Sequence, residues 1–119
     1  MFGVFRDEHP RLTLCLPALQ GILEVEFIID TGFAGDLALP SILVRQLNGL
    51  TGGPQERMLA TGQPFYCASY EISLDWGNET RTTEVLVLEG EPLLGTVLMR
   101  EHLLQVEMSD GGETVIEPL

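Results

Sequence analysis

The residues with the clearest chemical potential are the consecutive Asp30, Thr31 and Gly32. They follow Ile28 and Ile29, at the end of a predicted strand that is apolar on both faces and therefore expected to be buried. A carboxyl group there can hold or transfer a proton, the threonine offers a hydroxyl, and the glycine lets backbone amides approach. One carboxyl cannot serve as both acid and base in a hydrolysis, whereas two held close together share a proton and divide these roles.

The same tripeptide is also typical of an ordinary turn, in which the aspartate bonds the backbone and the glycine has a positive φ. Its context favours a site, because it follows an apolar strand and precedes a loop of small residues that leads to the extended segment 37–39. Asp36 ends this loop. We expect Asp36 to cap or solvate the loop rather than to act in catalysis, since the chain must run extended directly after it.

The elements that must position these residues are mostly short strands separated by close turns. Apolar and polar residues alternate with a period of two in several segments, which predicts strands with one buried face. The predicted strands are 11–17, 22–29, 37–39, 57–60, 65–76, 80–88, 104–108 and 114–117.

Two short helices and one loop complete this prediction. Pro40-Ser41 favours a helix over 42–47, a second short helix is expected over 97–102, and Thr51 to Pro54 is expected to be a loop. The pattern indicates an all-β fold, a small closed barrel or sheet with one or two short helices. The 119 residues predict a single domain with its core at about 11–117.

Charge excludes several classes of partner. The chain has 6 Lys and Arg against 18 Asp and Glu, a formal net charge of −12. Binding to nucleic acid or to an anionic membrane surface needs clustered basic residues and is therefore not expected. The sequence has no apolar run of about 18 residues and no apolar region of a signal peptide near Met1, which predicts a cytoplasmic protein that does not span a membrane.

The cysteines and histidines do not predict a metal site. Cys15 and Cys67 are too few for a disulfide framework, so we expect two reduced, buried thiols. Together with His9 and His102 they lack the paired short spacings of zinc sites, and no metal or other cofactor is expected. His102 is expected instead to close the second helix, and Trp76 to lie in the core.

Three segments resemble one known family. Residues 28–35 resemble the active-site loop of the retropepsin-like aspartic proteases, in particular the small prokaryotic members. Residues 93–95 (Leu-Leu-Gly) are similar to that family's second landmark, a hydrophobic-hydrophobic-Gly element beside the active-site loop. Residues 58–66 stand where the family has its flap hairpin. The resemblance covers roughly residues 11–117.

The resemblance implies a homodimer in which each chain contributes one Asp-Thr-Gly. Asp30 and its symmetry mate would activate a water that attacks a peptide carbonyl. Thr31 would bond the loop of the partner, and Gly32 would offer backbone contacts to the substrate. The flap would close over an extended peptide, which pairs like an added strand. The residues that the resemblance assigns to substrate binding are Phe33, Ala34, Thr61, Gly62, Gln63 and Leu94.

The sequence also departs from the viral members of the family. The terminal strands that interlock viral dimers are not expected, because His9-Pro10 and Glu117-Pro118 discourage a long pairing edge. Two further hypotheses remain open. One is a non-catalytic peptide-binding or scaffolding module on the same fold, and the other is a structural β domain in which the tripeptide is only a turn.

Overall fold

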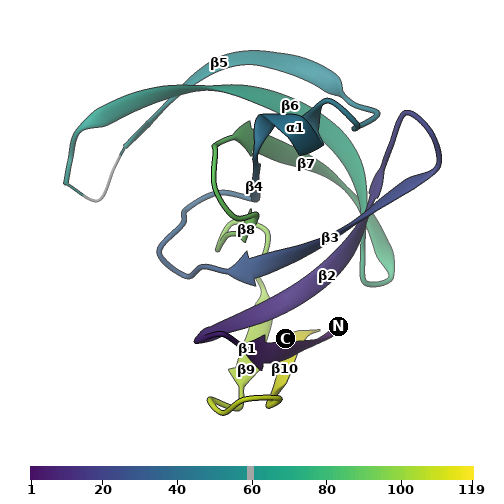
Figure 1. The fold of residues 1–119 in the computed structure, drawn as a ribbon, viewed down its shortest axis with the longest axis vertical. Coiled ribbons are helices and arrows are strands. Elements are labelled where there is room, and N and C mark those ends of the chain that lie inside the picture. The colour runs from purple at the N-terminus through teal and green to yellow at the C-terminus, as the bar shows by residue number, and fades with distance from the viewer. Residues whose placement is uncertain (59–60) are drawn as a thin grey trace.

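The computed structural model describes residues 1–58 and 61–119, which form one sheet of ten strands with one short helix (Figure 1). In the order of the sheet the strands are β5-β6-β7-β4-β8-β3-β2-β1-β10-β9. The elements are β1 Phe2–Arg6, β2 His9–Pro17, β3 Ile22–Ile29, β4 Leu37–Leu39, α1 Ser41–Val44, β5 Leu50–Met58, β6 Pro64–Trp76, β7 Glu79–Val87, β8 Leu93–Leu94, β9 His102–Val106 and β10 Glu113–Pro118. The predicted all-β class is confirmed.

The sheet is not closed into a barrel. It begins at β5 and ends at β9, and in the described part of the chain these two edge strands do not pair with each other. The expectation of a closed barrel is therefore wrong. The edge strand β5 carries Pro54 and a register shift between Thr51 and Gly53, two features that suit a strand paired on one side only.

The core forms where alternate residues of neighbouring strands meet. It includes Leu12, Leu14 and Leu16 of β2, Val25, Phe27 and Ile29 of β3, and Ile72, Leu74 and Trp76 of β6. These strands show the period-two alternation read from the sequence, so their buried faces and the core position of Trp76 are confirmed. Among the described residues, no helix is long and apolar enough to cross a membrane.

The short strand β8 determines how the candidate loop is held. It lies between β3 and β4, parallel to β3 through Ile28–Leu93 and Ile29–Leu94, and antiparallel to β4 through Leu37–Leu94. The connection from β3 to β4 is the loop 30–36. It must therefore pass the end of β8, which brings it beside the residues that follow Leu94.

Helix α1 is shorter than the predicted 42–47, because tertiary hydrogen bonds turn the chain back to the sheet. The Leu19 amide donates to the Gln46 carbonyl, and the Asn48 amide donates to the Pro17 carbonyl, both at 2.9 Å. Pro40 gives the helix no side-chain cap. The carboxylate of Glu89, on a distant turn, accepts from the Ser41 amide instead.

The second predicted helix, over 97–102, is wrong. Residues 96–101 form turns, and His102 begins β9. The amides of Thr96 and Val97, which would open such a helix, donate to the loop 30–36. Glu101 then takes a φ of 63°, which ends the turns in a left-handed residue.

Several loop and edge predictions are also wrong. The segment 51–54 belongs to β5, and the chain forms strands outside the expected core, with β1 paired to both β2 and β10. The prolines do not prevent strand pairing at the chain ends: His9-Pro10 begins β2 and Glu117-Pro118 ends β10. The backbone groups of the adjacent residues make the hydrogen bonds of the sheet that proline cannot donate. The predicted strand 57–60 is described only at residues 57 and 58, where it continues β5; residues 59–60 lie outside the described part.

The two cysteines are free but not buried as expected. Cys15 is exposed on β2, and Cys67 is half-buried on β6. Both lie on the strand face opposite the alternating core residues, since Leu14 and Leu16 occupy the buried face of β2. Burial raises the pKa of the Cys67 thiol, so this group is held in its neutral form.

Candidate active site

The Asp30 carboxyl is fixed by the backbone of its own loop. Its Oδ1 accepts a hydrogen bond from the Gly32 amide at 2.8 Å, and the Asp30 amide donates to the Leu94 carbonyl at 2.9 Å. The bond to Gly32 is the contact of an ordinary Asx turn, although Gly32 does not have the positive φ expected for one. Asp30 is half-buried and Gly32 is exposed, so one side of the carboxyl is held while the residue remains partly accessible.

The rest of the loop is docked on the segment that follows β8. Gly95 donates to the Asp36 carbonyl at 2.9 Å, Thr96 to the Phe33 carbonyl at 2.9 Å, and Val97 to the Gly35 carbonyl at 3.1 Å. The Thr96 hydroxyl reaches the same Phe33 carbonyl at 3.3 Å. Three successive amides therefore hold the loop, which fixes its backbone in one conformation.

Gly95 allows this close docking. A Cβ at position 95 would lie 2.6 Å from the Phe33 carbonyl oxygen and 2.8 Å from Cδ2 of the Phe33 ring. Real Cβ atoms do not approach other atoms so closely, so a side chain at position 95 would push the loop away. The glycine of the Leu-Leu-Gly segment is thus the point at which the two landmarks read from the sequence meet.

Leu94, predicted to bind substrate, instead anchors the loop of Asp30 through its backbone. Its side chain is fully buried in the core, so it is not available to contact a substrate. Its backbone carbonyl anchors Asp30 instead. The ring of Phe33 is half-buried against Gly35 and Gly95, and Ala34 is exposed. A role for these two loop residues in substrate binding stays a prediction.

Asp36 does not provide a second catalytic carboxyl. Its Oδ2 accepts from the Glu84 amide of β7 at 2.9 Å, so it joins the end of the loop to the neighbouring strand, as a cap was expected to do. Thr31 is exposed, and its hydroxyl has no hydrogen-bond partner within residues 1–58 and 61–119. One chain thus offers one anchored aspartate with an exposed threonine beside it.

The predicted flap residues lie at the turn of the β5–β6 hairpin. Thr61, Gly62 and Gln63 are exposed, and Gly62 has the positive φ of 87° that its place in the turn predicts. The hairpin extends toward the same side of the molecule as the loop between β3 and β4 (Figure 1). In the single chain the described residues show no hydrogen bond between this turn and Asp30.

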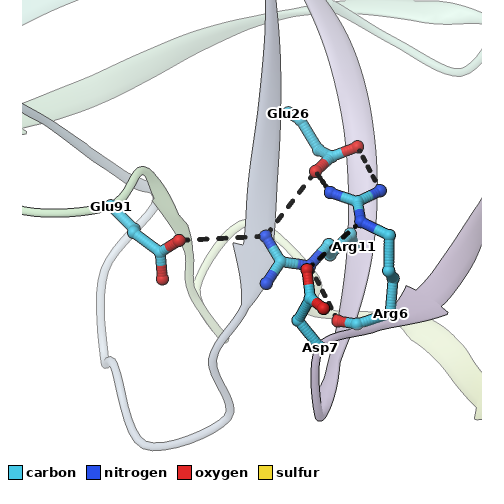
Figure 2. A network of polar contacts seen from close by, with 5 residues as sticks. All are labelled: Arg6, Asp7, Arg11, Glu26 and Glu91. Atoms are coloured by element: carbon cyan, nitrogen blue, oxygen red, sulfur yellow. Dashed lines mark hydrogen bonds and ion pairs between the residues drawn. The ribbon is translucent and has the colours of Figure 1, made fainter.

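A network of charges supports β3, whose last residue directly precedes Asp30, and the sequence patterns did not predict this network. Figure 2 shows Arg11 between two carboxylates, with its Nη1 3.6 Å from Glu26 and 4.0 Å from Glu91. The Arg11 Nε donates to the Arg6 carbonyl at 2.9 Å, and only 8% of Arg11 is exposed. The network therefore ties β1, β2 and β3 to the turn that precedes β8. The only local signal in the sequence is a basic residue at the start of the apolar strand 11–17; the structure places it opposite Ile28.

Glu26 is the central acid of this network. It forms an ion pair with Arg6. The hydrogen bond from Arg6 is the main cause that holds the pKa of Glu26 below its ordinary value, with smaller contributions from the charges of Arg6 and Arg11. Because its pKa is lowered, Glu26 is ionised under all but acidic conditions; it lies on β3, four residues before Asp30.

His102 is a half-buried residue at the start of β9 and does not close a helix, because residues 96–101 form turns. Trp76 Nε1 donates to His102 Nε2 at 3.2 Å, and the His102 Nδ1 lies 2.7 Å from the Arg100 carbonyl. Because the indole can only donate, Nε2 accepts and Nδ1 carries the proton. A hollow of about 600 Å³ lies beside this pair, and it is not lined by the loop 30–36. No cluster of three or more His, Cys, Asp or Glu side chains suited to a metal occurs among the described residues.

Comparisons of the chain with models of protein families, with curated proteins and with solved structures find no significant match. Membership of the retropepsin-like family thus stays a prediction that rests on residues 28–35, residues 93–95 and their order along the chain.

Proposed function

We propose that this protein is an aspartic endopeptidase of the retropepsin-like type, active as a homodimer. The observation that carries this proposal is the setting of Asp30. Its carboxyl is held by the Gly32 amide, on a loop that is docked by three successive amides from Gly95 to Val97. A carboxyl that is fixed on one side and accessible on the other suits the activation of a water molecule.

The reaction requires two carboxyl groups with different protonation states. The ionised carboxyl removes a proton from water as the water oxygen attacks the peptide carbonyl carbon, and the protonated carboxyl donates to the carbonyl oxygen. The first carboxyl, now protonated, then gives its proton to the amide nitrogen while the second takes back the proton of the new hydroxyl group, so the C=O bond re-forms and the C–N bond breaks. The products are one new carboxyl end and one new amino end.

A second copy of the chain is the source of the second carboxyl. Asp36, the other acid of the loop, already accepts from the Glu84 amide. A two-fold axis beside the loop would bring two Asp30 side chains together. The exposed Thr31 would then bond the loop of the partner, as the resemblance implies.

The substrate class is a polypeptide in extended conformation. The turn at Thr61, Gly62 and Gln63 would cover the peptide, and the strands of the hairpin would pair with its backbone. Pairing through main-chain groups binds many sequences, so the side chains of Phe33 and Ala34 are the candidates that select among them.

The proposal is tested by incubating a mixed pool of unstructured peptides with the wild-type protein and with Asp30→Asn. Asp110→Asn is the matched control, because it removes the same charge from an exposed turn far along the chain. Wild type and Asp110→Asn should cleave, and Asp30→Asn should lose at least about a hundredfold in rate. Equal cleavage by all three would identify a contaminating protease, and no cleavage by a folded, dimeric wild type would contradict the proposal.

The pH dependence of cleavage provides a second test. A pair of carboxyls that shares one proton is active only while it is singly protonated, which gives a bell-shaped profile. We expect the maximum at mildly acidic pH, between about 4 and about 6. Activity that rises steadily into alkaline solution and is abolished by a chelator would contradict this mechanism.

A further inference from the structure

The outer half of the β5–β6 hairpin lacks the support of a third strand. The register of β6 with β7 runs from Ser69 to Trp76, whereas its register with β5 continues out to Pro64. In the described part of the chain, residues 64–68 of β6 therefore pair with β5 alone. A two-stranded ribbon is marginally stable in water, so a further contact is needed to hold it in place.

An ion pair between Arg57 of β5 and Glu84 of β7 supplies that contact. β6 lies between these two strands in the sheet, so the guanidinium reaches across the face of β6. Cys67 of β6 is half-buried, and burial is the main cause that raises the pKa of its thiol, with opposite smaller contributions from the charges of Arg57 and Glu84. The Arg57 and Glu84 side chains are 30% and 36% exposed, so the pair is shielded only in part.

The guanidinium of Arg57 is also held from its own strand. Its Nη1 donates to the Glu56 carbonyl at 3.1 Å and lies 3.4 Å from the Gln55 Oε1. These contacts orient the side chain before it meets Glu84, which lowers the entropy lost in forming the ion pair. Arg57 is therefore a fixed donor rather than a freely moving surface charge.

Glu84 joins this contact to the candidate catalytic loop. Its backbone amide donates to Asp36 Oδ2 at 2.9 Å, and the Asp36 carbonyl accepts from Gly95 at 2.9 Å. A continuous series of contacts therefore runs from Arg57 on the hairpin, through Glu84 and Asp36, to the segment that anchors Asp30.

We propose that Arg57 and Glu84 are positioning residues that hold the outer half of the β5–β6 hairpin at a fixed place relative to the loop 30–36. The consequence for substrates rests on the proposed function: a held hairpin is preorganised to bind an extended peptide. Loss of the ion pair weakens substrate binding and leaves the loop bonds of Asp30 intact. It therefore raises KM more than it lowers kcat.

Amide hydrogen exchange tests the structural part of this proposal without any need for activity. In Arg57→Gln and in Glu84→Gln, exchange of β5 and of residues 64–68 should be about fivefold faster than in wild type, with β2 and β3 unchanged. The double variant should be no faster than either single one, because the two residues act through one contact. Exchange should return toward the wild-type rate in the charge-reversed pair Arg57→Glu with Glu84→Arg.

Arg6→Gln is the matched control, since the Arg6–Glu26 ion pair also crosses an intervening strand, here β2. It should leave exchange in the hairpin unchanged. Unchanged hairpin exchange in both Arg57→Gln and Glu84→Gln would overturn the proposal, as would faster exchange spread evenly over the chain.

Peptide cleavage tests the functional part. Arg57→Gln should raise KM about fivefold with kcat within about twofold of wild type, and Arg57→Lys should restore part of the loss. A fall in kcat at unchanged KM would contradict the positioning role. A wild type that does not cleave contradicts the proposed function instead, and the exchange experiment then still decides whether this ion pair holds the hairpin.

Discussion

At the scale of single residues, the candidate site is built mainly from backbone groups. The Asp30 carboxyl is held by the amide of Gly32, and its amide by the carbonyl of Leu94. The site also requires glycine at position 95, since any side chain there would collide with the loop 30–36. The position of the carboxyl is therefore sensitive to small additions of volume around it.

Gly95→Ala should destabilise the protein by about 3 kcal/mol, because the added methyl must displace Phe33 and the loop behind it. Urea unfolding at a fixed protein concentration measures this change. Gly77→Ala is the control: a Cβ there meets no atom within 4 Å, but its φ of 62° is left-handed and costs about 1 kcal/mol. Equal losses in the two variants would show that the docking of the loop is not tight.

The sequence indicates some of these residues and misses others for a physical reason. The sequence points to Asp30 and Gly95 as candidate site residues, because an acid after a buried strand and a glycine after two leucines can be recognised within one short segment. The roles of Leu94 and Arg11 were not found, because each depends on a partner distant in the sequence. Leu94 serves through its carbonyl and is buried between β3 and β4, and Arg11 is compensated by Glu26 and Glu91.

At the scale of elements, strands were predicted well because their signal is internal to each segment. The alternation in β2, β3 and β6 follows directly from one buried and one exposed face. The helices and the edge strands of the sheet were predicted poorly, because hydrogen bonds to segments distant in the sequence determine whether they form. Residues 96–101 have an apolar pattern that permits a helix, but their first amides are used by the loop 30–36.

The ion pair between β1 and β3 makes stability depend on pH in a defined direction. The hydrogen bond from Arg6 holds the pKa of Glu26 below its ordinary value, so the folded state binds fewer protons there than the unfolded state. The stabilisation by Glu26 is present above the ordinary glutamate pKa of about 4.3 and is lost as the pH falls through the lowered folded value.

Glu26→Gln should therefore cost about 0.5 kcal/mol near neutral pH, a small value because the pair is partly exposed, and nothing in strong acid. Unfolding by urea at several pH values measures this difference. Glu24→Gln is the matched control, since it removes the same charge from an exposed acid two residues earlier on β3, and it should change the free energy of unfolding less than Glu26→Gln near neutral pH. A cost of Glu26→Gln that grows as the pH falls would contradict the assigned direction.

At the scale of the whole molecule, charge opposes the dimer that the proposed function needs. Each chain carries a formal net charge of −12, so two copies repel each other at low ionic strength. Salt screens this repulsion over a Debye length of about 10 Å at 0.1 M. Apolar contacts and hydrogen bonds across the proposed interface would be affected far less.

The dissociation constant of the dimer should fall about tenfold between roughly 0.05 M and roughly 0.5 M sodium chloride. Sedimentation velocity over a series of protein concentrations measures it, and specific cleavage activity should follow the dimer fraction. A dimer that weakens with added salt would mean that ion pairs across the interface outweigh the overall repulsion, contrary to this account.

The central claim is that each active site contains two Asp30 side chains from two chains. The most direct measurement is the cleavage rate of a fixed amount of wild-type protein to which increasing amounts of Asp30→Asn are added and allowed to exchange subunits. If mixed dimers are inactive, activity per wild-type chain falls to about one half at equal amounts and to about one tenth at a roughly ninefold excess. Activity that stays constant under added Asp30→Asn would show that one chain acts alone, and would contradict the account.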